Sequence, residues 1–204
     1  MNIRDVIYFS PNYRMEDLDF DNRIQILSAF KDRIENYYFK PIQQLNSLHY
    51  AFGAGLILVS LVDALARYSS IEDNCGARIK HWLKNNVNLP YTKEEQEEIA
   101  KKFYNDFRCG LVHESHIKNS GQFSYDTWKA ITYENGFLII NPEAFFSEIK
   151  EYFARFLADL KVNDELYKIF FKRIRKDFEA ECIEFQNYYG RRKSKKKVNR
   201  ADQT

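Results

Sequence analysis

The stretch Ala51–Ala66, AFGAGLILVSLVDALA, is the most apolar run of the chain, and it contains the charged residue Asp63. A membrane-spanning helix needs about 20 consecutive apolar residues, so this run is short and charged for a span. We interpret it as part of a helix from about residue 42 to 67 that is buried at the centre of the protein. Gly53 and Gly55 have nucleotide-loop spacing but lack a preceding strand and a third glycine, so they predict close helix packing.

The composition around this helix predicts one largely helical domain. The chain has 204 residues, of which 45% are apolar and 29% charged, with only 7 Gly and 4 Pro. The 17 Phe and 14 Tyr predict a core filled with aromatic rings. Three widely spaced cysteines form neither a disulfide framework nor a paired metal motif, and the N-terminus MNIRDVIYFSP has no apolar leader. We therefore expect a cytoplasmic protein without a membrane segment.

Charge is distributed unevenly along the chain. The net charge is +2, but the last fourteen residues, RRKSKKKVNRADQT, contribute +6, which leaves −4 for residues 1–190. The body is therefore no basic cradle for nucleic acid. The tail has two interpretations: a solvated, disordered end, or an arm that binds phosphates without regard to sequence.

Hydrophobic periodicity and end signals predict the remaining elements. Thr92 and Glu95 form a capping-box pattern at the start of a helix whose apolar residues repeat every four positions. Asn135-Gly136 predicts a β-hairpin, and Asn141-Pro142 a helix start. The expected helices cover about residues 21–39, with an interruption or kink at Pro41, and then 42–67, 75–84, 92–114, 142–160 and 164–188.

These elements predict an all-α fold with a small β-hairpin before the two C-terminal helices. Residues 1–19 show no clear period and are expected to form an N-terminal extension. The helical domain covers residues 20–190, and the basic tail covers residues 191–204. His49 and His81 lack Cys, His or acidic neighbours at ligand spacing, so the sequence predicts no structural metal and no cofactor.

The segment Asp106–Ser115, DFRCGLVHES, carries the clearest chemical signal. Arg108 offers a permanently charged planar fork that matches phosphate oxygens. Histidine is the residue type that most often serves as a general acid or base, so His113 can take either role. Residues five apart diverge by about 140° around a regular α-helix. The two side chains are therefore expected to meet only if Gly110 loosens the last turn or a phosphate bridges them.

The motif RCGLVHE at the end of a capped helix resembles the signature of the HEPN family, an arginine followed by four to six residues and a histidine. The resemblance covers roughly residues 20–187, although only the short motif is specific. It implies an antiparallel helical bundle, a homodimer, and metal-independent endoribonuclease activity of the kind found in toxin–antitoxin, antiphage and RNA-processing systems. It further implies that Arg108 and His113 are catalytic, that RNA is the substrate, and that an antitoxin or another regulatory protein is a partner.

Two departures from the family pattern keep a second interpretation open. Cys109 follows the arginine where members commonly have a polar residue, and Ser115 stands where one subclass has a tyrosine. Together with the acidic body, the cysteine favours a non-catalytic HEPN-like module that binds RNA or protein, with the basic tail as a tether.

Further residues are candidates for supporting roles. One motif supplies one histidine, whereas the reaction needs an acid and a base, so a two-fold dimer would bring a second histidine. His116 is an in-chain substitute or else an exposed loop histidine. Lys118 is a candidate for binding phosphate. Glu114 either supports the site or is simply exposed to solvent. Cys109 is expected to pack against neighbouring residues rather than act as a nucleophile.

Asp63 is the remaining supporting candidate, because a carboxylate in a buried helix needs a partner. It either pairs with Arg108 and holds the guanidinium in place, or lies at the helix edge beside Arg67 in contact with water.

Overall fold

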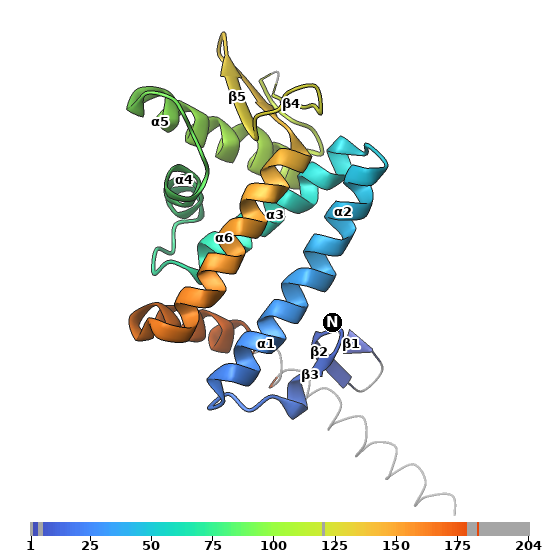
Figure 1. Cartoon of the computed structure of the whole chain (residues 1–204), viewed down its shortest axis with the longest axis vertical. Helices are drawn as coiled ribbons and strands as arrows, with labels where there is room; N and C mark the ends of the chain where they lie inside the picture. The colour runs from blue at the N-terminus through green and yellow to red at the C-terminus, as the bar shows by residue number, and fades with distance from the viewer. Residues whose placement is uncertain (1, 4–5, 120, 179–182, 184–204) are drawn as a thin grey trace, which may run out of the picture.

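The computed structural model describes residues 2–3, 6–119, 121–178 and 183, and it is mostly helical with two small sheets (Figure 1). The predicted helical class is therefore confirmed, but the β content is larger than predicted. Residues 1–19, expected to be an extension, contain a sheet of β1 (Asn2–Ile3), β2 (Val6–Ser10) and β3 (Tyr13–Arg14). The alternation of burial in β2 is hidden in the sequence because residues 6–9 are all apolar. Ser10 is also buried, where it donates a 2.5 Å hydrogen bond to Asp32.

Three helical segments form one continuous rod: α1 (Arg23–Ile34), η2 (Glu35–Phe39) and α2 (Lys40–Ser47). The predicted interruption at Pro41 is wrong, because the helix passes the proline. The segment η2 has π-type bonding, in which the Lys40 N–H donates to the Glu35 carbonyl five residues earlier. A proline lacks an N–H and clashes with the preceding turn of an α-helix, and the wider turn relieves this conflict.

The helix predicted for residues 42–67 is in fact two helices. The first, α2, ends at Ser47, and α3 (Ala51–Tyr68) begins after a tight connection in which His49 has a left-handed φ of 54°. In contrast, the predicted central position of the apolar helix is confirmed. It packs against α2, α4 (Cys75–Asn86) and α6 (Pro142–Val162). Its length and composition would suit a membrane span, but core helices pass the same test and half of α3 is buried inside the protein.

The rod and α6 lie side by side in opposite directions (Figure 1). Arg23 at the start of α1 donates a 2.9 Å hydrogen bond to the Leu160 carbonyl near the end of α6, and the Phe39 ring lies 5.4 Å from the Phe146 ring. A further helical segment covers residues 164–178; of the remainder of the helix predicted to residue 188, residues 179–182 and 184–188 lie outside the described residues. Phe30 contacts three aromatic rings from these elements, Tyr68, Phe153 and Phe170, which confirms the aromatic core.

The predicted hairpin is present and is part of a three-stranded sheet. Strands β5 (Ile131–Glu134) and β6 (Phe137–Ile140) are antiparallel, and Asn135 and Gly136 occupy their turn with φ of 51° and 80°. The unpredicted strand β4 (Gln122–Phe123) pairs with β6 in parallel and is too short to show a period. Its Phe123 ring packs directly over Gly55 of α3, while Gly53 faces Leu45 of α2. Gly55 therefore allows close approach of the Phe123 ring, and not of a neighbouring helix as predicted.

The two glycines of α3 predict opposite effects of alanine. A methyl group at Gly55 would overlap the Phe123 ring, so Gly55→Ala should lower the free energy of unfolding by about 1–3 kcal/mol. At Gly53 the methyl group would lie 3.4 Å from Leu45, an ordinary contact, so Gly53→Ala should raise it by about 0.5–1 kcal/mol. Urea unfolding measures both values. Equal effects would contradict the packing of Phe123 on α3.

Candidate active site

The candidate site is built on a helix that changes its hydrogen-bonding pattern along its length. Both hydrogen bonds of the predicted capping box between Thr92 and Glu95 are present at the start of α5 (Lys93–Lys102). The helix continues as η3 (Phe103–Glu114), a π-helix in which each N–H bonds to the carbonyl five residues earlier. Its buried side chains include the predicted stripe of Phe103, Phe107 and Leu111.

The π-helix places Arg108 and His113 on the same side. The Arg108 Nη1 atom lies 3.0 Å from the His113 Nε2 atom, with no bridging group between them. The divergence expected of a regular α-helix does not occur, because η3 is a π-helix, whose backbone hydrogen bonds join residues five apart. Tyr104 and Cys109 have the same spacing and also contact each other: burial and a hydrogen bond to Cys109 raise the pKa of Tyr104. Cys109 is thus partly buried against a tyrosine.

Gly110 lies within the wider turns of η3 and also leaves space for the loop that follows. A methyl group there would overlap the His116 backbone carbonyl, because the chain after Ser115 folds back over this position. The His116 N–H donates to the Gly110 carbonyl at 3.3 Å, and the Lys118 N–H donates to the Asp106 carbonyl at 3.1 Å. The glycine therefore allows the following loop to pack on η3.

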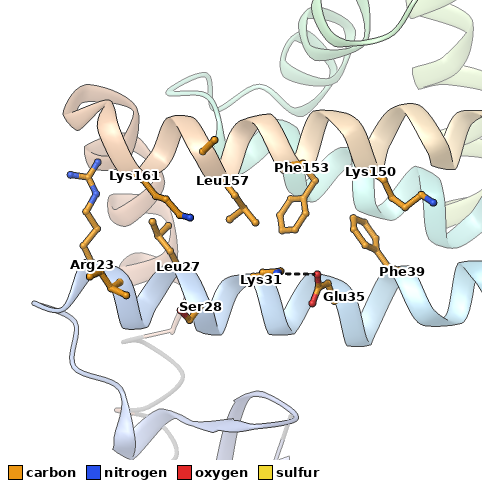
Figure 2. A pocket seen from close by; sticks show the side chains of 13 residues that line it. Arg23, Leu27, Ser28, Lys31, Glu35, Phe39, Lys150, Phe153, Leu157 and Lys161 are labelled. Carbon is orange, nitrogen blue, oxygen red and sulfur yellow. Dashed lines mark ion pairs between the residues drawn. The ribbon is translucent and has the colours of Figure 1, made fainter.

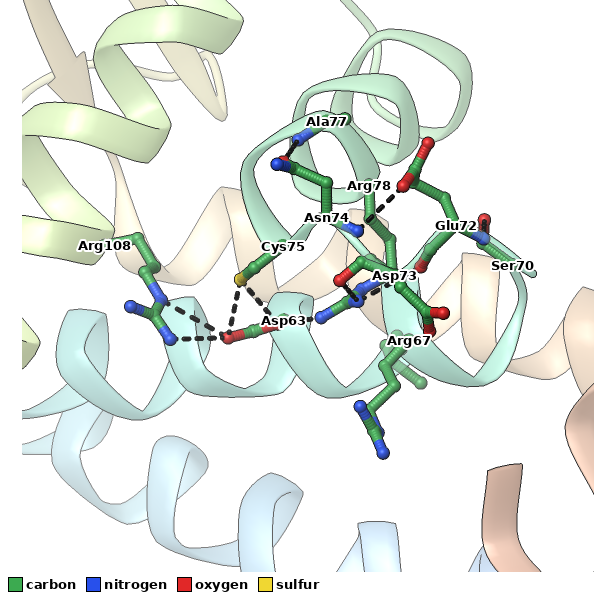
Figure 3. Close-up of polar contacts among 12 residues, drawn as sticks. Asp63, Arg67, Ser70, Glu72, Asp73, Asn74, Cys75, Ala77, Arg78 and Arg108 are labelled. Atoms are coloured by element: carbon green, nitrogen blue, oxygen red, sulfur yellow. Dashed lines mark hydrogen bonds and ion pairs between the residues drawn. The ribbon is translucent and has the colours of Figure 1, made fainter. Parts of the chain in front are cut away.

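Asp63 joins the motif to the centre of the fold (Figure 3). Its Oδ2 atom accepts hydrogen bonds from Arg108 Nη2 at 3.1 Å and Arg108 Nε at 3.3 Å, which confirms the predicted pairing. Its Oδ1 atom accepts a 3.0 Å hydrogen bond from Arg78 Nη2. The Cys75 thiol lies 3.5 Å from both oxygens. The alternative partner, Arg67, pairs with Asp177 instead.

One carboxylate thus faces two guanidinium groups. The Arg78 side chain is 5% exposed and the Arg108 side chain 20% exposed, so Arg78 is the inner member of the cluster and Arg108 the outer one. Burial lowers the pKa of Arg108, but the hydrogen bonds to Asp63 together with the electrostatic attraction of neighbouring side chains raise this pKa overall. Burial and the charge of Asp63 raise the pKa of Cys75, which keeps it a thiol rather than a nucleophilic thiolate.

A surface pocket of about 510 Å³ lies beside Arg108, the arginine of the arginine–histidine couple formed with His113. Its lining includes Arg67, Arg78 and Arg108, with Asp63 between the last two, and the exposed Val112. The His113 side chain is exposed next to this pocket on η3. The arrangement presents a fixed cation and an accessible imidazole to the same region of solvent.

The remaining predicted residues lie on the loop side of η3. His116 is exposed, and its Nδ1 atom lies 3.0 Å from the Glu114 carbonyl, which fits an exposed loop histidine. Glu114 is exposed and forms an ion pair with Lys118, which lowers the pKa of Glu114 and raises the pKa of Lys118. Lys118 is therefore engaged by an acid, and the structure shows neither residue in contact with Arg108.

Two residues that contact Asp63, Cys75 and Arg78, were not predicted as site residues, although their spacing in the sequence is informative. Both residues follow the helical spacing of the buried side of α4, where an arginine requires an acidic partner. That partner cannot be read from the sequence, because it depends on how α4 packs on α3. The apolar residues that share this spacing are Ile79, Trp82 and Leu83.

Fold and site together define a mostly helical protein with an exposed arginine–histidine couple whose arginine is anchored by an internal carboxylate. No family model, curated protein or solved structure matches the chain. Within the described part of the chain, no group of three or more His, Cys, Asp or Glu side chains is placed to hold a metal ion. The site therefore offers the guanidinium of Arg108 and the imidazole of His113, beside a pocket that Arg108 lines.

Removing the charge of Asp63 should destabilise the protein. Asp63→Asn leaves Arg78 and Arg108 facing each other without an anion, and we expect the free energy of unfolding to fall by about 2 kcal/mol. This is less than the full cost of breaking a buried pair, since Asp63 is 23% exposed. Urea unfolding is the measurement.

The matched control is Glu98→Gln on α5, whose carboxylate pairs with Lys101 through side chains that are 42% and 63% exposed. It should leave the free energy of unfolding nearly unchanged, because exposed ion pairs contribute little. Equal losses in the two variants would show that the Asp63 cluster is no anchor.

Proposed function

We propose that the protein is a HEPN-like endoribonuclease that cleaves RNA without a metal ion and acts as a cytoplasmic homodimer in a toxin, antiphage or stress-response role. The observation that carries the proposal is the 3.0 Å contact between Arg108 and the exposed His113. The antiparallel packing of α6 on the α1–α2 rod, with α3 at the centre, is compatible with a HEPN-like bundle.

Arg108 supplies the cation. Its Nε and Nη2 atoms are held by Asp63, so the guanidinium has a fixed orientation before any substrate binds. Such pre-organisation is effective because charge develops on the phosphate in the transition state and the enzyme need not reorganise at that moment. The Nη1 atom, directed at His113, is the donor that a phosphate oxygen would accept from.

His113 supplies the base. An arginine donates hydrogen bonds and does not accept them, so the contact with Arg108 requires a lone pair on His113 Nε2 and a neutral ring. When a phosphate oxygen replaces the imidazole as the acceptor of Arg108, Nε2 becomes available to take a proton. The proton comes from the ribose 2′-hydroxyl, whose oxygen attacks the adjacent phosphorus.

The leaving 5′-oxygen needs a proton, which one motif does not provide. In a two-fold dimer the protonated His113 of a second copy would donate it, and the P–O5′ bond breaks as the P–O2′ bond forms. The expected products are therefore a 2′,3′-cyclic phosphate and a 5′-hydroxyl. His116 is a poorer candidate for this acid, because its ring is engaged with Glu114 on the loop.

The decisive substitution is His113→Ala. The purified protein should cleave RNA equally well with and without a chelator, and the substitution should lower the rate by about 10²–10⁴-fold. Arg108→Lys should also lose activity, because lysine keeps the charge but not the fork that Asp63 holds. Gel analysis of a labelled RNA, with identification of the new ends, measures the rate and the chemistry.

His81→Ala is the matched control, since His81 is an exposed histidine on α4 and should leave the rate unchanged. An intact RNA under all conditions, or cleavage that survives in His113→Ala, would contradict the proposal. Expression of wild type and His113→Ala in a host then tests the toxin role, because only the wild type should arrest growth.

The rival function is that of a non-catalytic module that binds RNA or protein. Removal of residues 191–204 distinguishes this module from an endoribonuclease. This segment carries +6 of charge, so its removal should weaken RNA affinity and make the remaining binding less sensitive to salt. Cleavage should survive, since Arg108 and His113 lie in the body. Loss of RNA binding in a protein that never cleaves would favour the module.

A further inference from the structure

A groove of about 880 Å³ runs between the α1–η2 part of the rod and α6 (Figure 2). Its lining extends from Arg23 to Phe39 on one side and from Lys150 to Lys161 on the other. Sixteen residues of helix rise about 24 Å, so the groove is an elongated channel. It shares no lining residue with the pocket beside Arg108.

The floor of the groove is apolar and its walls are low. Figure 2 shows Leu27, Phe39, Phe153 and Leu157 directed into the space between the two helices. Small exposed residues, Ser28, Ala154 and Ala158, line it where larger side chains would close it. At one end Ile24 is 79% exposed, an unusual position for a large aliphatic side chain.

The rim of the groove is basic. Four cationic residues line it, Arg23, Lys31, Lys150 and Lys161, against one acid, Glu35. Glu35 lies 3.7 Å from Lys31, and Arg23 pairs with Asp164 outside the groove. Lys150 lies 4.7 Å over the Phe146 ring, a contact that leaves its charge uncompensated by an acid. The rim therefore has four positive charges against one negative charge in its lining, and the excess comes from the two lysines of α6.

We infer that this groove binds an amphipathic helix of about four turns from a partner protein, with its apolar side on the floor and acidic residues against the lysines of the rim. The elongated shape fits a helix laid between two helices, which is a common mode of recognition. The charge of the rim selects acidic flanks and disfavours basic ones, because like charges across an interface are costly. The inference does not depend on the proposed function.

The test uses a fluorescein-labelled, helix-stabilised 16-residue peptide with leucines at positions i, i+3, i+4 and i+7 and glutamates beside them. Fluorescence anisotropy should show saturable binding of one peptide per chain. A peptide with lysine in place of glutamate should bind at least about tenfold more weakly. Equal binding of the two peptides, or no binding of the acidic one, overturns the inference.

Two variants locate the binding. Lys31→Glu combined with Lys161→Glu reverses charge on both walls, and Ala158→Trp fills the channel; each should raise the Kd of the acidic peptide about tenfold or more. The control combines Lys172→Glu with Lys176→Glu, two exposed residues outside the groove, and should leave the Kd unchanged. Circular dichroism verifies that each variant is folded. A Kd that changes equally in control and groove variants overturns the assignment.

Discussion

The geometry of the candidate site depends on the hydrogen-bonding pattern of η3. A π-helix bonds residues five apart, and this spacing brings Arg108 to His113 and Tyr104 to Cys109. In an α-helix of the same sequence the guanidinium and the imidazole would point in different directions. π-Helical turns are rare and are frequently found at functional sites. The helix geometry, rather than the residue types alone, therefore makes the couple.

The Asp63 cluster fixes this couple relative to the rest of the protein. One carboxylate on α3 bonds to Arg78 of α4 and to Arg108 of η3, so three elements meet at a single anion. A buried ion pair contributes little net stability, since desolvation offsets the attraction, but it is costly to break. Its main consequence is orientation: the outer guanidinium cannot turn away without losing both of its hydrogen bonds to the Asp63 carboxylate.

The same helices give the protein two separate surfaces. The couple and its arginine-lined pocket involve α3, α4 and η3, whereas the apolar groove with a basic rim lies between α1 and α6. Contacts of α3 with both α6 and η3 connect the two regions through the core. With the proposed chemistry on one surface and the proposed recognition on the other, a partner would bind without covering His113.

Features that depend on near neighbours follow from the sequence alone: the capped start of α5, the Asn135-Gly136 turn, the apolar α3 and the presence of Arg108 and His113 in one short segment. The strict four-residue repeat of Ile99, Phe103, Phe107 and Leu111 also hinted at a turn wider than 3.6 residues, since an α-helical stripe mixes steps of three and four.

Tertiary packing determines which elements meet. The predicted apolar helix is interrupted near His49, and a helix continues through Pro41. Phe123 packs on Gly55, and Arg78 is the second arginine that binds Asp63. Each of these outcomes depends on residues far apart in the chain or on a small change of helix geometry. Local periodicity cannot report them, because packing free energy is gained only when the distant surfaces come together.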